Sequence, residues 1–350
     1  MTRYYTRACN FYYGSISKIL VKKKKSLPLS GNNKISFDQV EIISRKSKKK
    51  IFIDRLASLP KSQRNQISVD LKKITSKKKN FANLNFLKLP NIMGVLNLTP
   101  DSFSDGGKFN NKKMGIKKAV EMFKSGANII DVGGESTRPG SKGINEKLEW
   151  NRINEILKSI CKKIPTSLDT RKSQIMEKGI KLGIKIINDV SGLNFDTKTI
   201  DVLKIYKTPF IIQHSLGLPE NMQNNPRYKN ELLDIYDFLE QKINFLRSIG
   251  IKHNNIILDP GIGFGKNLKH NMNLINNISI FHSLGFPILV GNSRKRFIKE
   301  LSGKNDTKSR IGGTVASSLY LIMQGVQILR IHDVDEILQG IKVFNKLIKN

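Results

Sequence analysis

The sequence predicts an α/β protein, a (β/α)8 or TIM barrel with a small N-terminal extension. Seven or eight times between Ile92 and His332, a short apolar run ends in a polar or charged residue and is followed by a stretch of helical character. Hydrophobic strands that alternate with amphipathic helices are typical of a parallel sheet, and eight such units close into a barrel. The length agrees, because residues 91–350 come close to the roughly 250 residues of such a barrel.

Each expected strand is a short apolar run bounded by residues that favour turns or helix starts. In chain order the strands are residues 92–97, 128–132, 166–169, 185–189, 209–213, 256–259, 287–290 and 328–330. The loops after the first two strands are long and rich in glycine, so we expect them to act as mobile lids. An irregular stretch to residue 226 precedes a long helix that ends near residue 250.

Polar residues end these strands, and in a barrel the carboxyl ends of all strands point to one mouth. We therefore expect side chains that lie far apart in the sequence to meet in a single site. They are Asn97, Asp131, Asp169, Asn188 with Asp189, Gln213 with His214, Asp259, Asn292 with Ser293, and Arg330 with His332.

Two regions follow from this pattern: a basic extension, residues 1–90, and the barrel, residues 91–350. The extension has 22 Lys and Arg against four acids, a formal charge of +18, and the barrel carries the remaining +15. Its lysine runs lack interleaved aromatic residues, so we expect no specific nucleic-acid partner. We expect these lysines to lie on a solvated surface, and the alternative is loose attraction to polyanions or anionic surfaces, or steering of anionic substrates. Short strands at 37–43 and 51–55 and a helix at 69–75 are expected, and the barrel should close without them.

The compartment is predicted from cysteine usage and apolar runs. Cys9 and Cys161 are too few for a disulfide framework, which favours the cytoplasm. No apolar run approaches the roughly 18 residues that span a membrane, so no membrane partner is expected. Residues 1–30 lack acids, as transit peptides do, but their clustered tyrosines make a poor amphipathic helix.

Five motifs lie in one order along the barrel region. They read MGVLNLTPDSFSDGG (93–107), DVGGESTRPG (131–140), DPGIGFGK (259–266), SRK (293–295) and RIHDV (330–334). Together they resemble the dihydropteroate synthases, pterin-binding enzymes of folate biosynthesis, over essentially all of residues 91–350. The resemblance implies a transferase that condenses 6-hydroxymethyl-7,8-dihydropterin diphosphate with p-aminobenzoate. The products are 7,8-dihydropteroate and pyrophosphate, and the enzyme is expected to be a homodimer.

A pterin presents a ring NH and an exocyclic NH2 side by side, so a buried carboxylate is the matching acceptor. The resemblance gives this role to Asp259, places Asp169 near the other end of the ring, and puts Asn188 on its edge. Lys295 then faces the pterin carbonyl, and Gln213 completes the substrate-binding set on the strands. The alternative for strand-end Asp and Asn is simple capping of the next helix.

The diphosphate is expected at Arg330 and His332, where such barrels commonly bind phosphate. The resemblance places Asn97 on a Mg²⁺ cofactor that neutralises the departing oxygens. Loss of pyrophosphate would leave a pterin methylene cation, which the arylamine nitrogen attacks in an SN1-like step. A surface Arg/His pair without ligand contact is the alternative.

The p-aminobenzoate subsite is expected from the two lids and nearby loops. By resemblance, Ser293 binds the benzoate carboxylate, and Phe264 with Lys295 flanks the ring. The closing residues of the lids are Phe103, Thr137, Arg138 and Pro139. Asp101, Asp105 and Glu135 could instead form a carboxylate metal cage, which is less favoured because Mg²⁺ in phosphate chemistry needs few protein ligands.

One departure from the family stands after the fifth strand, where residues 213–223 read QHSLGLPENMQ. Ser215 replaces a methionine that packs against the pterin, so the fit of that wall differs. A corrinoid methyltransferase would share the pterin contacts but has no use for residues 137–140 or for Arg330 and His332. An inactive basic binding module is disfavoured because the motif residues are intact, and 90 residues are too few for a fused pyrophosphokinase.

Overall fold

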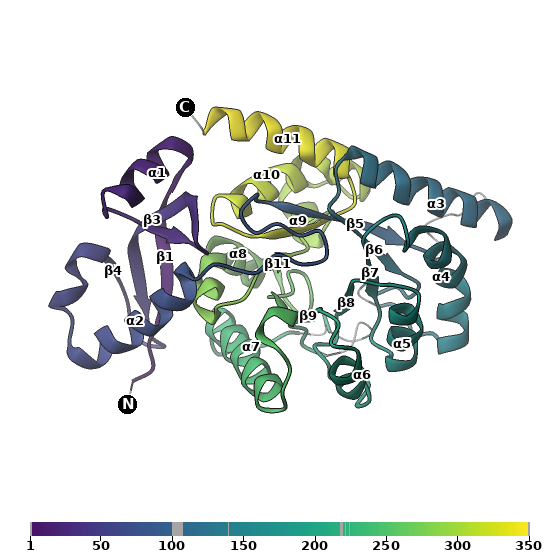
Figure 1. The fold of residues 1–350 in the computed structure, drawn as a ribbon, viewed down its shortest axis with the longest axis horizontal. Coiled ribbons are helices and arrows are strands. Elements are labelled where there is room, and N and C mark those ends of the chain that lie inside the picture. Colours follow the sequence, from purple (N-terminus) through teal and green to yellow (C-terminus); the bar gives the residue numbers. More distant parts are fainter. Residues whose placement is uncertain are drawn as a thin grey trace.

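A computed structural model describes residues 2–99, 108–138, 140–217, 220, 222–223 and 225–348. Figure 1 shows a barrel with helices around it and an N-terminal lobe on one side. No helix in the described ranges combines the length and the apolar character needed to cross a bilayer.

Eight parallel strands form the barrel, in the spatial order β10-β9-β8-β7-β6-β5-β12-β11. A parallel bridge between Leu258 and Ile288 joins the two ends of this order. The predicted fold is therefore confirmed, with strand ends within two residues of those expected. The strands are β5 (Asn91–Asn97), β6 (Ile129–Gly133), β7 (Thr166–Asp169), β8 (Ile186–Asp189), β9 (Phe210–Gln213), β10 (Ile256–Asp259), β11 (Leu289–Val290) and β12 (Ile328–Ile331).

Helices follow the strands and cover the barrel's outer face (Figure 1). Asparagine side chains cap the starts of three of these helices: Asn145 accepts from the Leu148 amide, Asn230 from the Leu233 amide and Asn267 from the His270 amide. The elements are α3 (Lys108–Ser125), α4 (Glu146–Ile160), α5 (Ser173–Lys181), α6 (Thr199–Tyr206), α7 (Glu231–Ser248), η3 (His253–Asn255), α8 (Leu268–Asn276), η4 (Ile278–Leu284), α9 (Arg296–Ser302), η5 (Lys308–Arg310), α10 (Ile311–Ile322) and α11 (Val334–Leu347).

The interior of the barrel is closed at the end opposite the mouth. Leu84 and Phe86, from the segment before β5, are fully buried there. They belong to one apolar cluster with a residue from each of seven strands: Met93, Ile129, Ile186, Ile211, Ile257, Leu289 and Ile328. Residues 81–90 thus contribute to the barrel core, although the sequence groups them with the extension.

The N-terminal lobe is a small sheet with two helices. It consists of β1 (Tyr5–Tyr13), α1 (Gly14–Lys22), β2 (Leu27–Leu29), β3 (Asn32–Ile43), β4 (Lys48–Phe52), η1 (Ile53–Ser58) and α2 (Lys61–Thr75). The long strand β3 pairs antiparallel with β1, β2 and β4. The expected strand at 51–55 is wrong beyond Phe52, because pairing with β3 ends there and a 3-10 helix begins. The strand β1 escaped prediction because its burial does not alternate.

The lobe packs directly on the barrel. All of η4 is buried, with β1 and α2 against it, and Tyr5 belongs to the main barrel core. The Tyr5 hydroxyl donates to Asp237 on α7 at 2.9 Å, and the buried Lys78 ammonium donates to the Gly285 carbonyl at 2.7 Å. The lobe therefore covers one side of the barrel, away from the strand ends that carry the motifs.

Candidate active site at the barrel mouth

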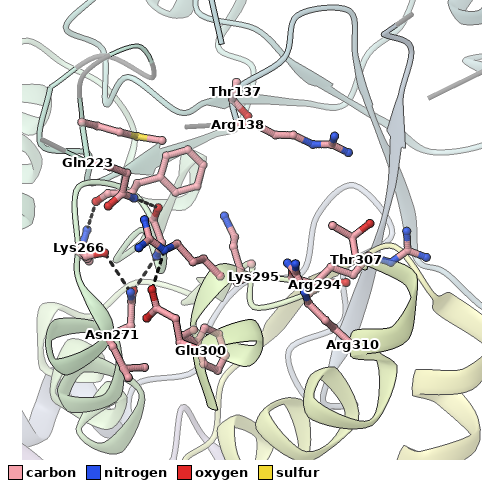
Figure 2. Close-up of a pocket in the computed structure, with 18 of the residues that line it drawn as sticks. Thr137, Arg138, Gln223, Lys266, Asn271, Arg294, Lys295, Glu300, Thr307 and Arg310 are labelled. Atoms are coloured by element: carbon pink, nitrogen blue, oxygen red, sulfur yellow. Dashed lines mark hydrogen bonds and ion pairs between the residues drawn. The ribbon is translucent and has the colours of Figure 1, made fainter. Parts of the chain in front are cut away.

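A cavity of about 460 Å³ lies at the carboxyl ends of the strands. Figure 2 shows Thr137 and Arg138 on one side of it and Lys295 and Arg294 on the other. Of the predicted site residues, those that line this cavity are Asn97, Thr137, Arg138, Phe264, Ser293, Lys295, Arg330 and His332. Positive side chains dominate the lining, which suits a ligand with several negative charges.

Arg330 binds two carboxylates at the mouth. Its Nε donates to Asp131 Oδ2 and its Nη2 to Asp169 Oδ2, both at 2.6 Å. Asn188 donates to the same Asp131 oxygen at 3.0 Å. Two of the three guanidinium nitrogens of this predicted diphosphate ligand therefore hold carboxylates. Asp131 is fully buried, and the sequence pattern singled it out only as a strand end.

Four of the buried polar atoms that lack a hydrogen-bond partner among the described residues lie on Asp131, Asp169, Asn188 and Gln213. Three are acceptors: Asp131 Oδ1, Asp169 Oδ1 and Asn188 Oδ1; the fourth is the donor Gln213 Nε2. Buried polar groups are normally satisfied, so each exception calls for an explanation. These residues come from the adjacent strands β6 to β9, so their unused hydrogen-bonding capacity is grouped in one buried patch. None of the four is among the residues that line the main cavity.

Asp259 ends β10 and is held by the turn that follows it. Its Oδ1 accepts from the Gly261 amide at 2.7 Å. Gly261 has a φ of +71°, and a Cβ there would lie 1.9 Å from the His214 carbonyl oxygen. Only glycine fits such a position, so the DPGIGFG sequence fixes the carboxylate. The turn also brings Phe264 under Lys295, whose ammonium lies 4.1 Å from the ring centroid.

Burial changes the protonation of the central groups. It raises the pKa of Asp259 to about 6, against the attraction of Lys295 and Lys266. Burial, reinforced by the charge on Arg330, lowers the pKa of Lys295 to about 8. It also raises the pKa of Asp169, despite the pull of Arg330.

Ser293 and His332 lie together beside the cavity. The Ser293 hydroxyl accepts from the His332 amide at 3.2 Å and lies 3.1 Å from His332 Nδ1. Burial and the charge of Arg330 lower the pKa of His332 well below its usual value. The imidazole is therefore neutral, and it offers an anion a hydrogen bond but no charge. Arg294 is held instead by Asp333, with Nε to Oδ2 at 2.9 Å.

Two of the predicted lid residues, Phe103 and Pro139, lie outside the described residues, as do Asp101 and Asp105. Glu135, the third member of the alternative metal cage, forms ion pairs with Arg171 and Lys172 at 3.0 Å each. No cluster of three acidic, histidine or cysteine side chains suited to a metal occurs in the described part of the chain.

The departure at Ser215 is visible beside the main cavity. Its hydroxyl donates to the Gly217 carbonyl at 3.1 Å and lies 3.9 Å from the Met222 sulfur. A second cavity of about 170 Å³ borders Ser215 and Phe264. The small side chain of Ser215 therefore lies at the edge of an open space beside Phe264.

A buried Lys–His pair was missed by the sequence reasoning. Lys266 lies 3.0 Å from His214 Nδ1 and donates to the Phe264 carbonyl at 2.8 Å. Burial lowers the pKa of Lys266 to about 7. The only signal for it was its place at the end of the DPGIGFGK motif, because the contact spans 52 residues.

Comparison with known proteins agrees with this geometry. The model of the family described as "Pterin binding enzyme" matches residues 93–332. The dihydropteroate synthase of Clostridium beijerinckii is 42% identical over 261 residues, which are 74% of this chain and 94% of that protein. That of Neisseria meningitidis serogroup B is 41% identical over 268 residues, 75% and 94% of the two chains.

Solved structures give the same result. The Thermus thermophilus dihydropteroate synthase in complex with 4-aminobenzoate superposes with a TM-score of 0.68 at 35% identity, covering 76% of this chain and 98% of that one. The Clostridium difficile enzyme, crystallised in the presence of pteroic acid, gives 0.70 at 37% identity, with coverage of 78% and 100%.

The fold, the mouth and these matches define a pterin-binding enzyme. Within that class, the chain belongs to the dihydropteroate synthase family, transferases of the pterin-methylene group in folate biosynthesis.

Proposed function

We propose that the barrel mouth condenses 6-hydroxymethyl-7,8-dihydropterin diphosphate with p-aminobenzoate. The observation that carries this assignment is the patch of unpartnered polar atoms on Asp131, Asp169, Asn188 and Gln213. A pterin edge carries alternating donors and acceptors in one plane, which such a patch would satisfy. Asp259 accepts from the ring NH and NH2, and Lys295 donates to the carbonyl side.

The reaction exchanges one bond at the pterin methylene carbon. The carbon–oxygen bond to the diphosphate breaks, and the electron pair leaves with pyrophosphate. The arylamine nitrogen then forms a bond to the methylene carbon and loses a proton to solvent. Lys295, His332 and the free edge of Arg330 bind the anionic groups. Ser293, Thr137 and Arg138 hold the benzoate, with Phe264 against its ring and Phe103 and Pro139 closing the lids.

A Mg²⁺ ion would be held at Asn97, which lines the cavity from the end of β5. One amide oxygen is a sparse protein contribution, but Mg²⁺ at phosphates keeps several waters and takes its remaining ligands from the substrate. When bound, the ion would neutralise the departing oxygens. The cationic lining would repel a free Mg²⁺ ion, so the ion would have to arrive already bound to the diphosphate.

Turnover of the purified full-length protein tests the assignment. We expect pyrophosphate release that requires both the pterin diphosphate and p-aminobenzoate, and formation of dihydropteroate by mass spectrometry. Pterin binding without pyrophosphate release would instead favour a methyltransferase. The family resemblance also leads us to propose a homodimer in the cytoplasm, for which light scattering on the purified protein should give twice the 39.7 kDa chain mass.

A further inference from the structure

The loop between β6 and α4, residues 134–145 and here called loop 2, is tied at both ends. The Gly134 carbonyl accepts from Arg152 Nη1 at 2.8 Å. The Ile144 amide donates to Glu135 Oε1 at 2.9 Å, which joins the end of the loop to its start. The Ser141 hydroxyl bonds back within the tip, to the carbonyls of Ser136 and Arg138. Glu135 is therefore the point where the loop closes on itself.

The Glu135 carboxylate also binds two cations from the turn between β7 and α5. Its Oε2 accepts from Arg171 Nε, and its Oε1 from Lys172 Nζ, both at 3.0 Å. Lys172 pairs in addition with Glu149 on α4. All four side chains are buried. Charges in such surroundings are held tightly in place, because each partner would otherwise be left uncompensated.

Arg171 extends this network to the pterin side of the site. Its guanidinium carbon lies 4.0 Å from the Phe195 ring centroid. Together with Ser215 and Phe264, Arg171 lines the second cavity, and Phe264 lines the main cavity as well. Glu135 thus connects loop 2 with a wall next to the pterin, while it contacts neither substrate subsite directly.

We propose that Glu135 is a positioning residue, which holds Thr137 and Arg138 in place over the cavity. Through these two residues it sets the affinity for p-aminobenzoate. The inference rests on the proposed function. Figure 2 shows Thr137 and Arg138 at the upper edge of the cavity, opposite Lys295. Without the hydrogen bonds and ion pairs of Glu135, p-aminobenzoate would have to order the tip of loop 2 when it binds. Ordering even one residue costs enough to weaken binding by about tenfold.

Two variants separate this role from a general loss of structure. Glu135→Ala removes the acceptor and the charge, whereas Glu135→Gln is similar in size and keeps an oxygen for the Ile144 amide. The matched control is Glu155→Gln, an exposed acid on α4 that pairs with Lys158. For each protein we would measure kcat, KM for both substrates, and hydrogen exchange of the peptide that contains Ile144.

In Glu135→Ala we expect KM for p-aminobenzoate to rise about tenfold, with faster exchange at Ile144. KM for the pterin diphosphate and kcat should stay within about twofold, because the Phe195 ring still holds Arg171 beside the second cavity. Glu135→Gln should show a smaller, roughly threefold rise in KM for p-aminobenzoate. If Glu135→Ala does not fold, the ratio of the two KM values in Glu135→Gln decides. If the wild-type protein turns over normally, two results would overturn the proposal. They are equal increases in both KM values and an unchanged KM for p-aminobenzoate. A wild-type protein without turnover would overturn the proposed function and, with it, the substrate role of Glu135.

Discussion

Arg330 Nη2 on β12 donates to Asp169 Oδ2 on β7 over 2.6 Å, although two strands of the barrel lie between them. Because Arg330 Nε reaches Asp131 as well, one guanidinium compensates two buried carboxylates. The cation predicted as a phosphate ligand is thus also the counter-ion of the buried Asp131 and Asp169.

Replacing this guanidinium should destabilise the fold. We expect Arg330→Ala to lower the free energy of unfolding by about 3–5 kcal/mol, because it leaves buried carboxylates without a partner. Urea unfolding measures the change. Arg296→Ala is the control, since Arg296 is exposed and its ion pair with Glu300 lies within α9. Its loss should cost at most about 1 kcal/mol. Equal costs for the two variants would contradict the counter-ion role.

Arg330→Lys keeps a charge and tests the contact with diphosphate. A lysine offers one ammonium group, whereas the planar guanidinium of arginine can donate two parallel hydrogen bonds to a phosphate. We expect the pterin diphosphate to lose about 10- to 150-fold in affinity, the range for one hydrogen bond to a charged group. Binding of 6-hydroxymethyl-7,8-dihydropterin, which has no diphosphate, should change less. Calorimetry on both ligands gives the comparison, and parallel losses would show that Arg330 does not touch the diphosphate.

Asp259→Asn should weaken pterin binding directly. The substitution exchanges one acceptor for an NH2 that faces a ligand donor. Loss of a hydrogen bond to a charged group costs about 1.5–3 kcal/mol, or roughly 10- to 150-fold in affinity. The Gly261 amide still finds an oxygen, so the fold should persist, which circular dichroism can verify. Unchanged affinity in a folded variant would exclude Asp259 as the pterin acceptor.

Pterin affinity should pass through a maximum between about pH 6 and pH 8. Asp259 accepts two donors only when ionised, and burial raises its pKa to about 6, so affinity falls as the pH drops through that value. Lys295 donates only when protonated, and burial lowers its pKa to about 8, so affinity falls as the pH rises past it. Titrations with 6-hydroxymethyl-7,8-dihydropterin avoid phosphate ionisation. In Asp259→Asn the acidic limb should disappear; its persistence would assign that limb to another group.

Truncation should reveal which residues before β5 belong to the barrel. A chain of residues 81–350 keeps Leu84 and Phe86 in the barrel core, whereas residues 91–350 lack both. Each fully buried side chain contributes about 1.5–3 kcal/mol, so the shorter chain should be less stable by about 3–6 kcal/mol. Full-length protein is the reference and should be the most stable, because its lobe covers η4. Chemical unfolding of the three proteins measures the order, and equal stabilities for both truncations would place the boundary at residue 90.

The sequence by itself determined the barrel and the ring of polar strand ends. Apolar runs that end in Asn97, Asp169, Asn188 and Asp259 fix local strands, and parallel closure then brings their ends together whatever the intervening loops do. The DPGIGFG sequence indicates a turn at Gly261, whose φ is +71°, but only the folded barrel brings the His214 carbonyl close to it.

Tertiary structure alone decided which charges pair. The sequence offers Glu135 and Asp131 many possible cations, and only the packed barrel selects Arg171, Lys172 and Arg330 as their partners. The partner of Asp131 lies 199 residues away. The sequence also missed β1, because burial along this strand does not alternate. The periodicity of apolar residues depends on which face of a single segment is exposed to solvent. A buried ion pair depends on how two segments that are distant in the sequence pack together in the fold.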